Sequence, residues 1–201
     1  MGSARPVAIA LVHHPVYNMR RETVVTAITN LDVHDLARLA RTYDLRRFYV
    51  VTPVAAQQAL AERIVEHWVS GEGGARNALR REAMQRVGVA ADVAAAARDM
   101  EEREGRRPEL VATGARPRGV VTGYDEARRR LSAPAPGEPE AGPVLLLFGT
   151  GWGLHDDVVA QCDWTLAPIE GAGTGYNHLS VRTAVGIILD RLLGRTEVGA
   201  L

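Results

Sequence analysis

The run PVLLLF at 143–148 constrains the fold more than any other segment of this chain, because it is apolar throughout. A strand exposed on one face alternates apolar and polar residues, whereas a strand covered on both faces reads as a continuous apolar run. Such strands are typical of parallel sheets with helices on both sides. The chain is therefore predicted to be an α/β protein with this segment as a central parallel strand.

Shorter apolar runs alternate with helical patterns along the rest of the chain, as expected for parallel α/β folds. The predicted strands are 7–12, 46–53 and 164–169, with a weaker one near 87–90, and 109–116 is predicted to be a strand that ends in a turn. The predicted helices are 31–43, 55–69, 75–87, 91–105, 122–131 and 178–192. We expect the strand at 164–169 to pair with the one at 143–148.

A single domain over 1–201 is predicted, because 201 residues suffice for one substantial core and are few for two. Residues 132–143 contain four prolines and two glycines and almost no core residues. They are predicted to form an exposed loop within that domain.

The composition is that of an ordinary globular protein, with 46% hydrophobic and 24% charged residues. The formal net charge of zero argues against a generally basic nucleic-acid binder but permits a local basic patch. All 24 basic residues are arginines, which suit phosphate and base contacts, although a GC-rich genome also favours arginine. Cys162 is the single cysteine, which excludes an intramolecular disulfide and a Cys-based zinc site and fits a reducing cytoplasm. No membrane span is expected, because no apolar segment approaches roughly 20 residues.

Three loops are expected at the carboxyl ends of strands, where open parallel sheets bind ligands: 113–115, 149–154 and 169–176. None has the glycine spacing of a dinucleotide fingerprint, and a phosphate-binding P-loop is excluded because the chain has no lysine. The second and third loops are glycine-rich turns that expose backbone N–H and C=O groups. This pattern favours a neutral or cationic nucleoside ligand held by main-chain groups and apolar walls.

The segments LLLFGTGWGL (145–154) and APIEGAGTGYNHLSVRTAVGIILDRL (167–192) resemble the SPOUT class of RNA methyltransferases. They look closest to a bacterial branch with FGTGWGL and YNHLSVR signatures, and the resemblance runs from about Val7 to Leu193. It implies a SPOUT-type α/β knot, a mainly parallel sheet with helices on both faces and a C-terminal trefoil knot. It also implies S-adenosyl-L-methionine as cofactor and an RNA nucleotide as methyl acceptor. A cytoplasmic homodimer is expected, in which the first and last helices meet a twofold partner.

The resemblance assigns cofactor contacts to all three loops. The residues that match the cofactor-binding positions of the class are Thr113, Gly114, Gly149, Thr150, Gly151, Leu154, Pro168, Ile169, Gly171, Tyr176, Asn177, Leu179 and Ser180. Single members also suit structural roles, since Asn177 is a good N-cap and Leu179 is expected to face the core. As an ordered set they indicate a cofactor site.

Residues 26–51 resemble the first motif of SpoU-type members of that class, in which an Asn-containing turn leads into a helix with an arginine. Counting back from the following strand places Arg38 at the arginine position, with Asn30 or Asp32 at the start of the turn. Arg41, one turn further on, is the alternative. The resemblance implies that this arginine orients the acceptor phosphate or stabilises the deprotonated nucleophile. The usual Asn-x-Gly turn here has Asp32 in place of glycine.

Histidines and one charged segment are the remaining candidates. His13 and His14 follow the first strand and have the chemistry of a general base, although a histidine at a strand end more often packs or caps. His34 and His67 match no metal-ligand spacing, and methyl transfer to RNA needs no metal. Segment 70–82 combines glycines with arginines, which fits a lid, an RNA contact or a plain charged surface.

Two other functions stay open from sequence. One is a non-catalytic RNA- or nucleotide-binding protein with the knotted fold, which the departure at Asp32 permits. The other is a methyltransferase that acts on a protein or small molecule, which the zero net charge permits.

Overall fold

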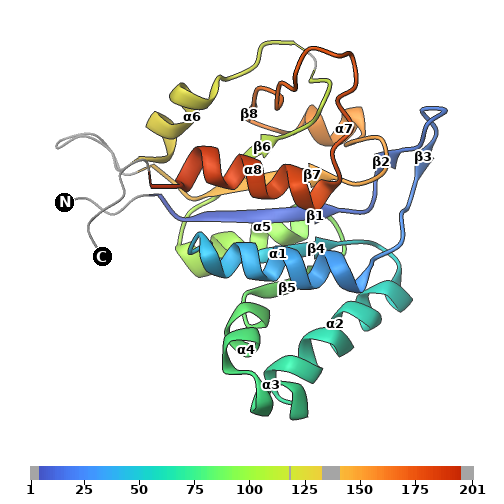
Figure 1. Ribbon diagram of the computed structural model, residues 1–201, viewed down its shortest axis with the longest axis vertical. Helices are drawn as coiled ribbons and strands as arrows, with labels where there is room; N and C mark the ends of the chain where they lie inside the picture. The colour runs from blue at the N-terminus through green and yellow to red at the C-terminus, as the bar shows by residue number, and fades with distance from the viewer. Residues whose placement is uncertain (1–4, 118, 133–140, 196–201) are drawn as a thin grey trace.

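The computed structural model describes residues 5–117, 119–132 and 141–195. Six parallel strands form the main sheet in the order β5-β4-β1-β7-β6-β8 (Figure 1). These strands are β1 Val7–Val12, β4 Phe48–Val51, β5 Val87–Ala90, β6 Glu109–Ala112, β7 Val144–Gly149 and β8 Trp164–Thr165. A short antiparallel hairpin, β2 Val16–Tyr17 with β3 Thr23–Val24, follows β1 and was not expected from the sequence.

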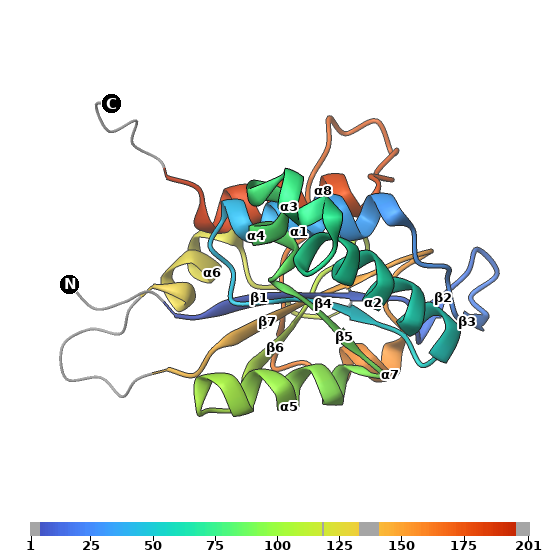
Figure 2. The same cartoon turned by 90° about the horizontal axis from the view of Figure 1, so that it is seen from below.

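Helices cover both faces of the sheet, as Figure 2 shows. The helices of one face are α1 Asn30–Thr42, α2 Ala55–Val69, α4 Ala78–Met84, α6 Tyr124–Leu131 and α8 Val181–Leu193, with α3 Glu72–Arg76 between α2 and α4. The other face carries α5 Val93–Glu104 and the short α7 Asp156–Val159. The expected α/β class, with helices on both faces, is confirmed.

Strands β1 and β7 lie at the centre of the sheet and divide two apolar cores. In β1, Ile9 and Leu11 join the core under α1 and α8, while Ala8 and Ala10 face α5. Leu146 in β7 has no exposed surface, and its strand neighbours alternate between the same two cores. The prediction that 143–148 is a central strand is therefore confirmed.

The expected pairing of 164–169 with 143–148 is wrong. β7 has β1 on one side and β6 on the other, so β8 pairs with β6 at the edge of the sheet. Two side chains hold β8 there: the Asp163 carboxylate accepts the Leu110 N–H at 2.8 Å, and the Trp164 indole donates to Glu109 at 3.1 Å. A two-residue strand carries too little pattern to reveal its neighbour.

Two helices begin at other residues than the sequence predicted, because capping residues set where they start. The predicted helix at 75–87 is two helices, because Asn77 leaves helical geometry with φ −143° and ψ 88° and caps α4 by accepting the Arg80 N–H. The last helix begins at Val181, since the Ser180 hydroxyl accepts the Thr183 N–H. Both side chains satisfy backbone donors that a helix start leaves unpaired.

Two further expectations concern exposed or membrane segments. Most of the predicted loop at 132–143 falls on residues 133–140, which are outside the described ranges. Among the helices that are described, none is long and apolar enough to cross a bilayer.

Candidate functional site

The three candidate loops follow β6, β7 and β8, and because these strands are parallel, all three loops lie at the end of the sheet where the strands have their carboxyl ends. In the structure the first loop is the whole connection from β6 to α6, and the third is the whole connection from β8 to α8. The two are tied together where Thr122 donates its N–H to the Thr165 carbonyl at 2.8 Å and accepts the Ala167 N–H at 2.9 Å. The second loop follows β7, whose Gly149 lies in register with Val12 at the end of β1. Residues far apart in sequence thus surround the ends of the central strands.

The loop from Gly149 to Leu154 is held by backbone bonds to the hairpin. Tyr17 donates its N–H to the Gly153 carbonyl at 3.0 Å, and its own carbonyl accepts the Trp152 N–H at 2.8 Å. Gly151 has a φ of +57°, and a Cβ there would lie 2.8 Å from the Tyr17 oxygen. The glycine is therefore required by the hairpin, whose backbone fills the space beside it.

A chain of side-chain hydrogen bonds connects this loop to β1 and the hairpin segment. His13 Nδ1 lies 3.0 Å from Thr26 Oγ1, which lies 2.5 Å from Thr150 Oγ1. Thr150 Oγ1 in turn donates to the Val12 carbonyl at 3.0 Å. His13 is fully buried, and its Nε2 has no hydrogen-bond partner among the described residues. His13 therefore helps to hold the loop at 149–154 in place through Thr26 and Thr150.

Burial keeps the His13 imidazole neutral. Removal from water lowers its pKa from 6.5 to about 4, and the nearby Asp32 carboxylate offsets only part of this effect. A general base works best with a pKa near the working pH. His13 is thus a packing and positioning residue, the role that a histidine at a strand end more often has.

The third loop, from Pro168 to Ser180, is closed by its own side chains. The Asn177 amide donates to the Ile169 carbonyl at 2.9 Å, so Asn177 does not cap the last helix as expected. Leu179 is 45% exposed and does not face the core. Tyr176 is also exposed. Gly171 is exposed, and a Cβ there would have only the Tyr176 carbonyl oxygen within 4 Å, at 3.8 Å.

In the first loop, Thr113 and Gly114 differ in character. Thr113 is buried, and its hydroxyl donates to the Leu147 carbonyl at 2.8 Å, which fastens the loop to β7. At Gly114 a Cβ would meet no atom within 4 Å. Gly114 is exposed and has free space at its Cβ position.

The start of α1 is fixed to the start of α8 by an ion pair. Asp32 is buried, accepts the Thr29 hydroxyl at 2.6 Å and lies 2.7 Å from Arg182 Nη1. Asn30, which was expected in a turn, is the first residue of α1 and is exposed, while Thr29 is the N-cap. The Asp32 carboxylate therefore has a structural partner within the chain.

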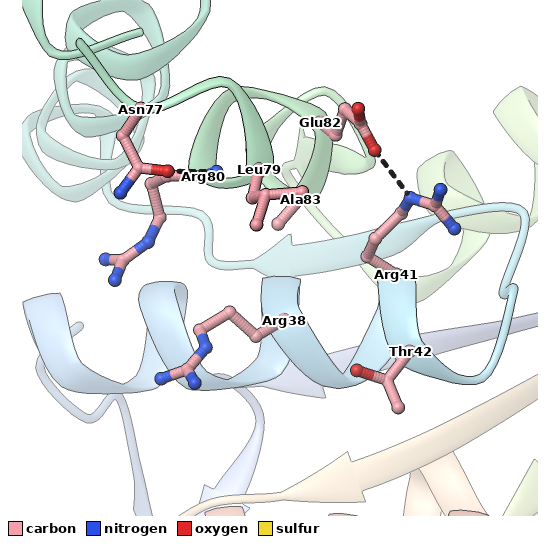
Figure 3. Close-up of a pocket in the computed structure, with 8 residues that line it drawn as sticks. All are labelled: Arg38, Arg41, Thr42, Asn77, Leu79, Arg80, Glu82 and Ala83. Atoms are coloured by element: carbon pink, nitrogen blue, oxygen red, sulfur yellow. Dashed lines mark hydrogen bonds and ion pairs between the residues drawn. The ribbon is translucent and has the colours of Figure 1, made fainter.

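Arg38 and Arg41 line a groove of about 510 Å³ between α1 and α4, away from the three loops. Arg80 of α4 also lines it, and Figure 3 shows the guanidinium groups of Arg38 and Arg80 at one end and that of Arg41 at the other. Arg41 pairs with Glu82 at 3.1 Å. Within the described part of the chain, Arg38 makes no hydrogen bond or ion pair. The groove thus gathers three cations against one carboxylate, which suits an anionic ligand.

Arg80 is held in this groove by aromatic neighbours from two other helices. Its Nη1 lies 2.6 Å from His34 Nδ1, and its guanidinium lies 5.2 Å from the Trp68 ring centroid. Burial and the Arg80 charge lower the pKa of His34, which favours the neutral ring as acceptor. Part of segment 70–82 therefore builds the groove, since Asn77 and Arg80 both belong to it.

Among the described residues, no group of three potential metal ligands comes together. Cys162 is partly buried in the α5 core, and burial raises its thiol pKa to about 12, so it is a poor nucleophile and ligand.

Sequence reasoning missed Thr26, Arg182 and Trp152. Thr26 lies in a segment without apolar periodicity, so nothing in the sequence places it beside Thr150. Arg182 follows the cap of α8 but finds Asp32 only through the packing of α1 on α8. Trp152 lies within the glycine-rich turn at 149–154, where a large aromatic residue could have been recognised as a sign of a binding surface.

The neutral His13 predicts acid sensitivity. Its folded-state pKa lies below its unfolded value, so the unfolded chain binds more protons as the pH falls from about 6.5 to about 4. Stability should fall in that window by up to about 1.4 kcal/mol per pH unit because of this group and be unaffected by it above the window. His13→Asn, which keeps a polar atom near Thr26 but does not titrate, should show a shallower loss in urea unfolding. Equal pH slopes for both proteins would contradict this role.

A model of the family described as SAM-dependent RNA methyltransferase matches residues 6–194. The chain is 43% identical over 190 residues to a tRNA (guanine-N(1)-)-methyltransferase of Oleidesulfovibrio alaskensis, covering 94% of this chain and 42% of that protein. It is 40% identical over 191 residues to an uncharacterised protein of Aquifex aeolicus, covering 95% and 90% respectively. The chain therefore spans less than half the length of the first of these relatives.

A similar fold occurs in the SpoU methyltransferase AviRb from Streptomyces viridochromogenes, solved in complex with the cofactor AdoMet. The TM-score is 0.54 at 15% identity, with 95% of this chain and 58% of that chain covered. This likeness concerns the fold and agrees with the parallel sheet described above. Because the family model spans nearly all described residues, the chain belongs to the family of SAM-dependent RNA methyltransferases.

Proposed function

We propose that this protein transfers a methyl group from S-adenosylmethionine to a nucleotide of RNA. The observation that carries the proposal is the meeting of three loops at the carboxyl edge of β6, β7 and β8, the edge at which open parallel sheets bind ligands. Membership of the family and the AdoMet complex of AviRb support the same cofactor.

The residues of these loops fit a nucleoside that is held by main-chain groups of the protein. Gly114 and Gly171 are exposed and have room at their Cβ positions, and the half-buried Pro168 and Ile169 supply apolar surface. Leu154, which was expected to contact the cofactor, is buried in the core under α5. When bound, S-adenosylmethionine supplies an activated methyl group. The protein's part is to fix the geometry of transfer, which Thr150 and Asn177 serve by holding their loops in place.

For the acceptor, we propose that the groove between α1 and α4 binds RNA phosphate. Arg38 is the cation there without a partner among the described residues, while Arg41 is partly neutralised by Glu82. Arg38 does not reach the cofactor loops of its own chain, since no residue of those loops lines the groove. In a twofold dimer it would act on RNA bound at the partner's cofactor site.

We infer a homodimer and a knotted C-terminus from the family resemblance. β8 lies at the sheet edge beside β6, whereas α8 contacts β7 and α1 near the centre, so the chain between β8 and α8 returns toward the middle of the sheet, which supports the proposal of a knot. The exposed Leu31 and Leu179 flank the junction of α1 and α8, where a partner would bury them. A cytoplasmic location fits an enzyme that modifies RNA.

Gly114→Leu should weaken S-adenosylmethionine binding by at least about tenfold, because the side chain would enter the space assigned to the cofactor. The backbone φ of Gly114 lies outside the left-handed region and its Cβ position is free, so the variant should fold. Gly123→Leu is the matched control, as Gly123 also borders open space and has a φ of −67°. Isothermal titration compares the affinities. Unchanged affinity in folded Gly114→Leu would move the cofactor elsewhere.

Arg38→Ala should leave cofactor affinity unchanged but lower kcat on total tRNA by roughly a hundredfold or more, the effect of removing one electrostatic stabiliser. Arg38→Lys should recover little, because lysine lacks the planar fork. Arg98→Ala, on α5 at the opposite face, serves as control. Wild-type turnover in Arg38→Ala would reassign the role to Arg41. Cofactor binding by the unaltered chain without turnover on any RNA would instead favour a binding protein.

Light scattering at micromolar concentration should give about twice the chain mass of 21.7 kDa. The reason is that an acceptor groove distant from the cofactor loops of the same chain needs a second copy to complete the site. Leu31→Asp should produce monomers and abolish methylation together. A monomer that still methylates RNA would refute the dimeric site.

A further inference from the structure

Three aromatic side chains gather on the outer surface of the glycine-rich loops. Trp152 of the second loop and His178 of the third have ring centroids 5.5 Å apart, and His178 lies 5.2 Å from Tyr176. Trp152 is 51% and Tyr176 74% exposed, so neither ring belongs to a core. The interplanar angles of 66° and 56° show that no pair is a parallel stack. Ring faces therefore remain open to solvent.

The backbone beneath these rings is held firmly although the rings are not packed. Trp152 donates its N–H to the Tyr17 carbonyl, between Gly151 and Gly153, which both have positive φ. Asn177, between Tyr176 and His178, is bonded to the Ile169 carbonyl. A stable backbone that presents large apolar rings to water is a feature of binding surfaces rather than of folding.

A cation from the first loop joins this aromatic cluster. Arg116 Nη2 lies 3.5 Å from His178 Nε2, and a guanidinium can only donate in such a contact. The Arg116 side chain is exposed. All three loops of the cofactor site thus contribute a residue to one surface that combines flat apolar faces with a guanidinium.

We propose that Trp152, Tyr176 and His178 form a stacking platform for an unpaired base of the RNA substrate, with Arg116 contacting the adjoining phosphate. The inference rests on the proposed function and adds how the RNA is recognised. Proteins that bind unpaired RNA combine aromatic rings, on which bases stack, with arginines that contact the backbone. A platform beside the cofactor loops would hold the acceptor region as an open strand at the point of transfer.

The test compares base stacking with phosphate contact. Trp152→Ala and Tyr176→Ala should each weaken binding of a short oligouridylate by about 5- to 100-fold, the range that one stacked base contributes. The same variants should bind an abasic oligonucleotide of equal length as the wild type does. Trp152→Phe and Tyr176→Phe keep a ring and should lose little. Arg116→Ala should weaken binding of both oligonucleotides.

Three controls tell base stacking apart from cofactor binding and from dimer contact. Leu60→Ala removes an exposed apolar side chain from α2 and should change nothing. Cofactor affinity and the dimer mass should be unchanged in Trp152→Ala, whose residue is not among the assigned cofactor contacts, and the thermal midpoints of both alanine variants should match the wild type because the rings are exposed. Loss of cofactor binding in Trp152→Ala would assign the rings to the adenosine of the methyl donor, and loss of the dimer would assign them to the partner chain; either overturns the platform.

Failure of the platform can be told apart from failure of the proposed function. If the wild-type chain methylates total tRNA and both alanine variants bind oligouridylate as tightly as it does, the platform is wrong and the function stands. If the wild-type chain binds the cofactor but neither binds nor methylates RNA, the proposed function is wrong and the platform falls with it.

Discussion

The pairing of β1 with β7 is the constraint on which the site depends. These two strands are buried on both faces, and their register places Gly149 beside Val12, so the end of one central strand lies against the loop that follows the other. His13 and Thr150 can then be linked through Thr26. A slip in this register would separate the loop from the groups that hold it, because side chains alternate between the two faces.

The rest of the architecture places two chemically different surfaces on the molecule. The carboxyl edge of the sheet offers backbone groups, glycines and apolar walls, whereas the groove between α1 and α4 offers guanidinium groups. The Asp32–Arg182 pair joins the helices that lie between them. It is a charged contact in which Asp32 is almost fully buried, so its main contribution is the relative placement of α1 and α8 rather than a large gain in stability.

Periodicity predicted the parallel sheet well, because buried strands such as 144–148 and 7–12 leave a continuous apolar record. It failed for β8, because two residues are too few to show a pattern. It also failed for the hairpin after β1, because backbone hydrogen bonds hold that hairpin and leave no pattern in the side chains. Asn77 and Ser180 are readable caps, but Asn177 is equally suited to that role. Only the Ile169 carbonyl, supplied by the folded loop, decides between them.

Some candidate site residues could likewise be predicted from the sequence, whereas others depend on how the helices pack. The glycine-rich loops could be recognised from composition and order, since their chemistry lies in the backbone. The meeting of Arg38 with Arg80 could not be predicted, because it depends on how α4 packs against α1, and β4, α2 and α3 lie between these helices in the chain.

The bonds between the hairpin and the loop at 149–154 have a consequence for ligand binding. The amides of Thr150, Trp152 and Gly153 already donate within the chain, so a ligand at this loop is left chiefly the Gly151 amide and the free carbonyls. Because these bonds form without a ligand, we expect the loop to be ordered before binding and to lose little entropy when a ligand arrives. Amide hydrogen exchange in this loop should accordingly be slow before any ligand is added, with the hairpin and the loop opening to solvent as one unit.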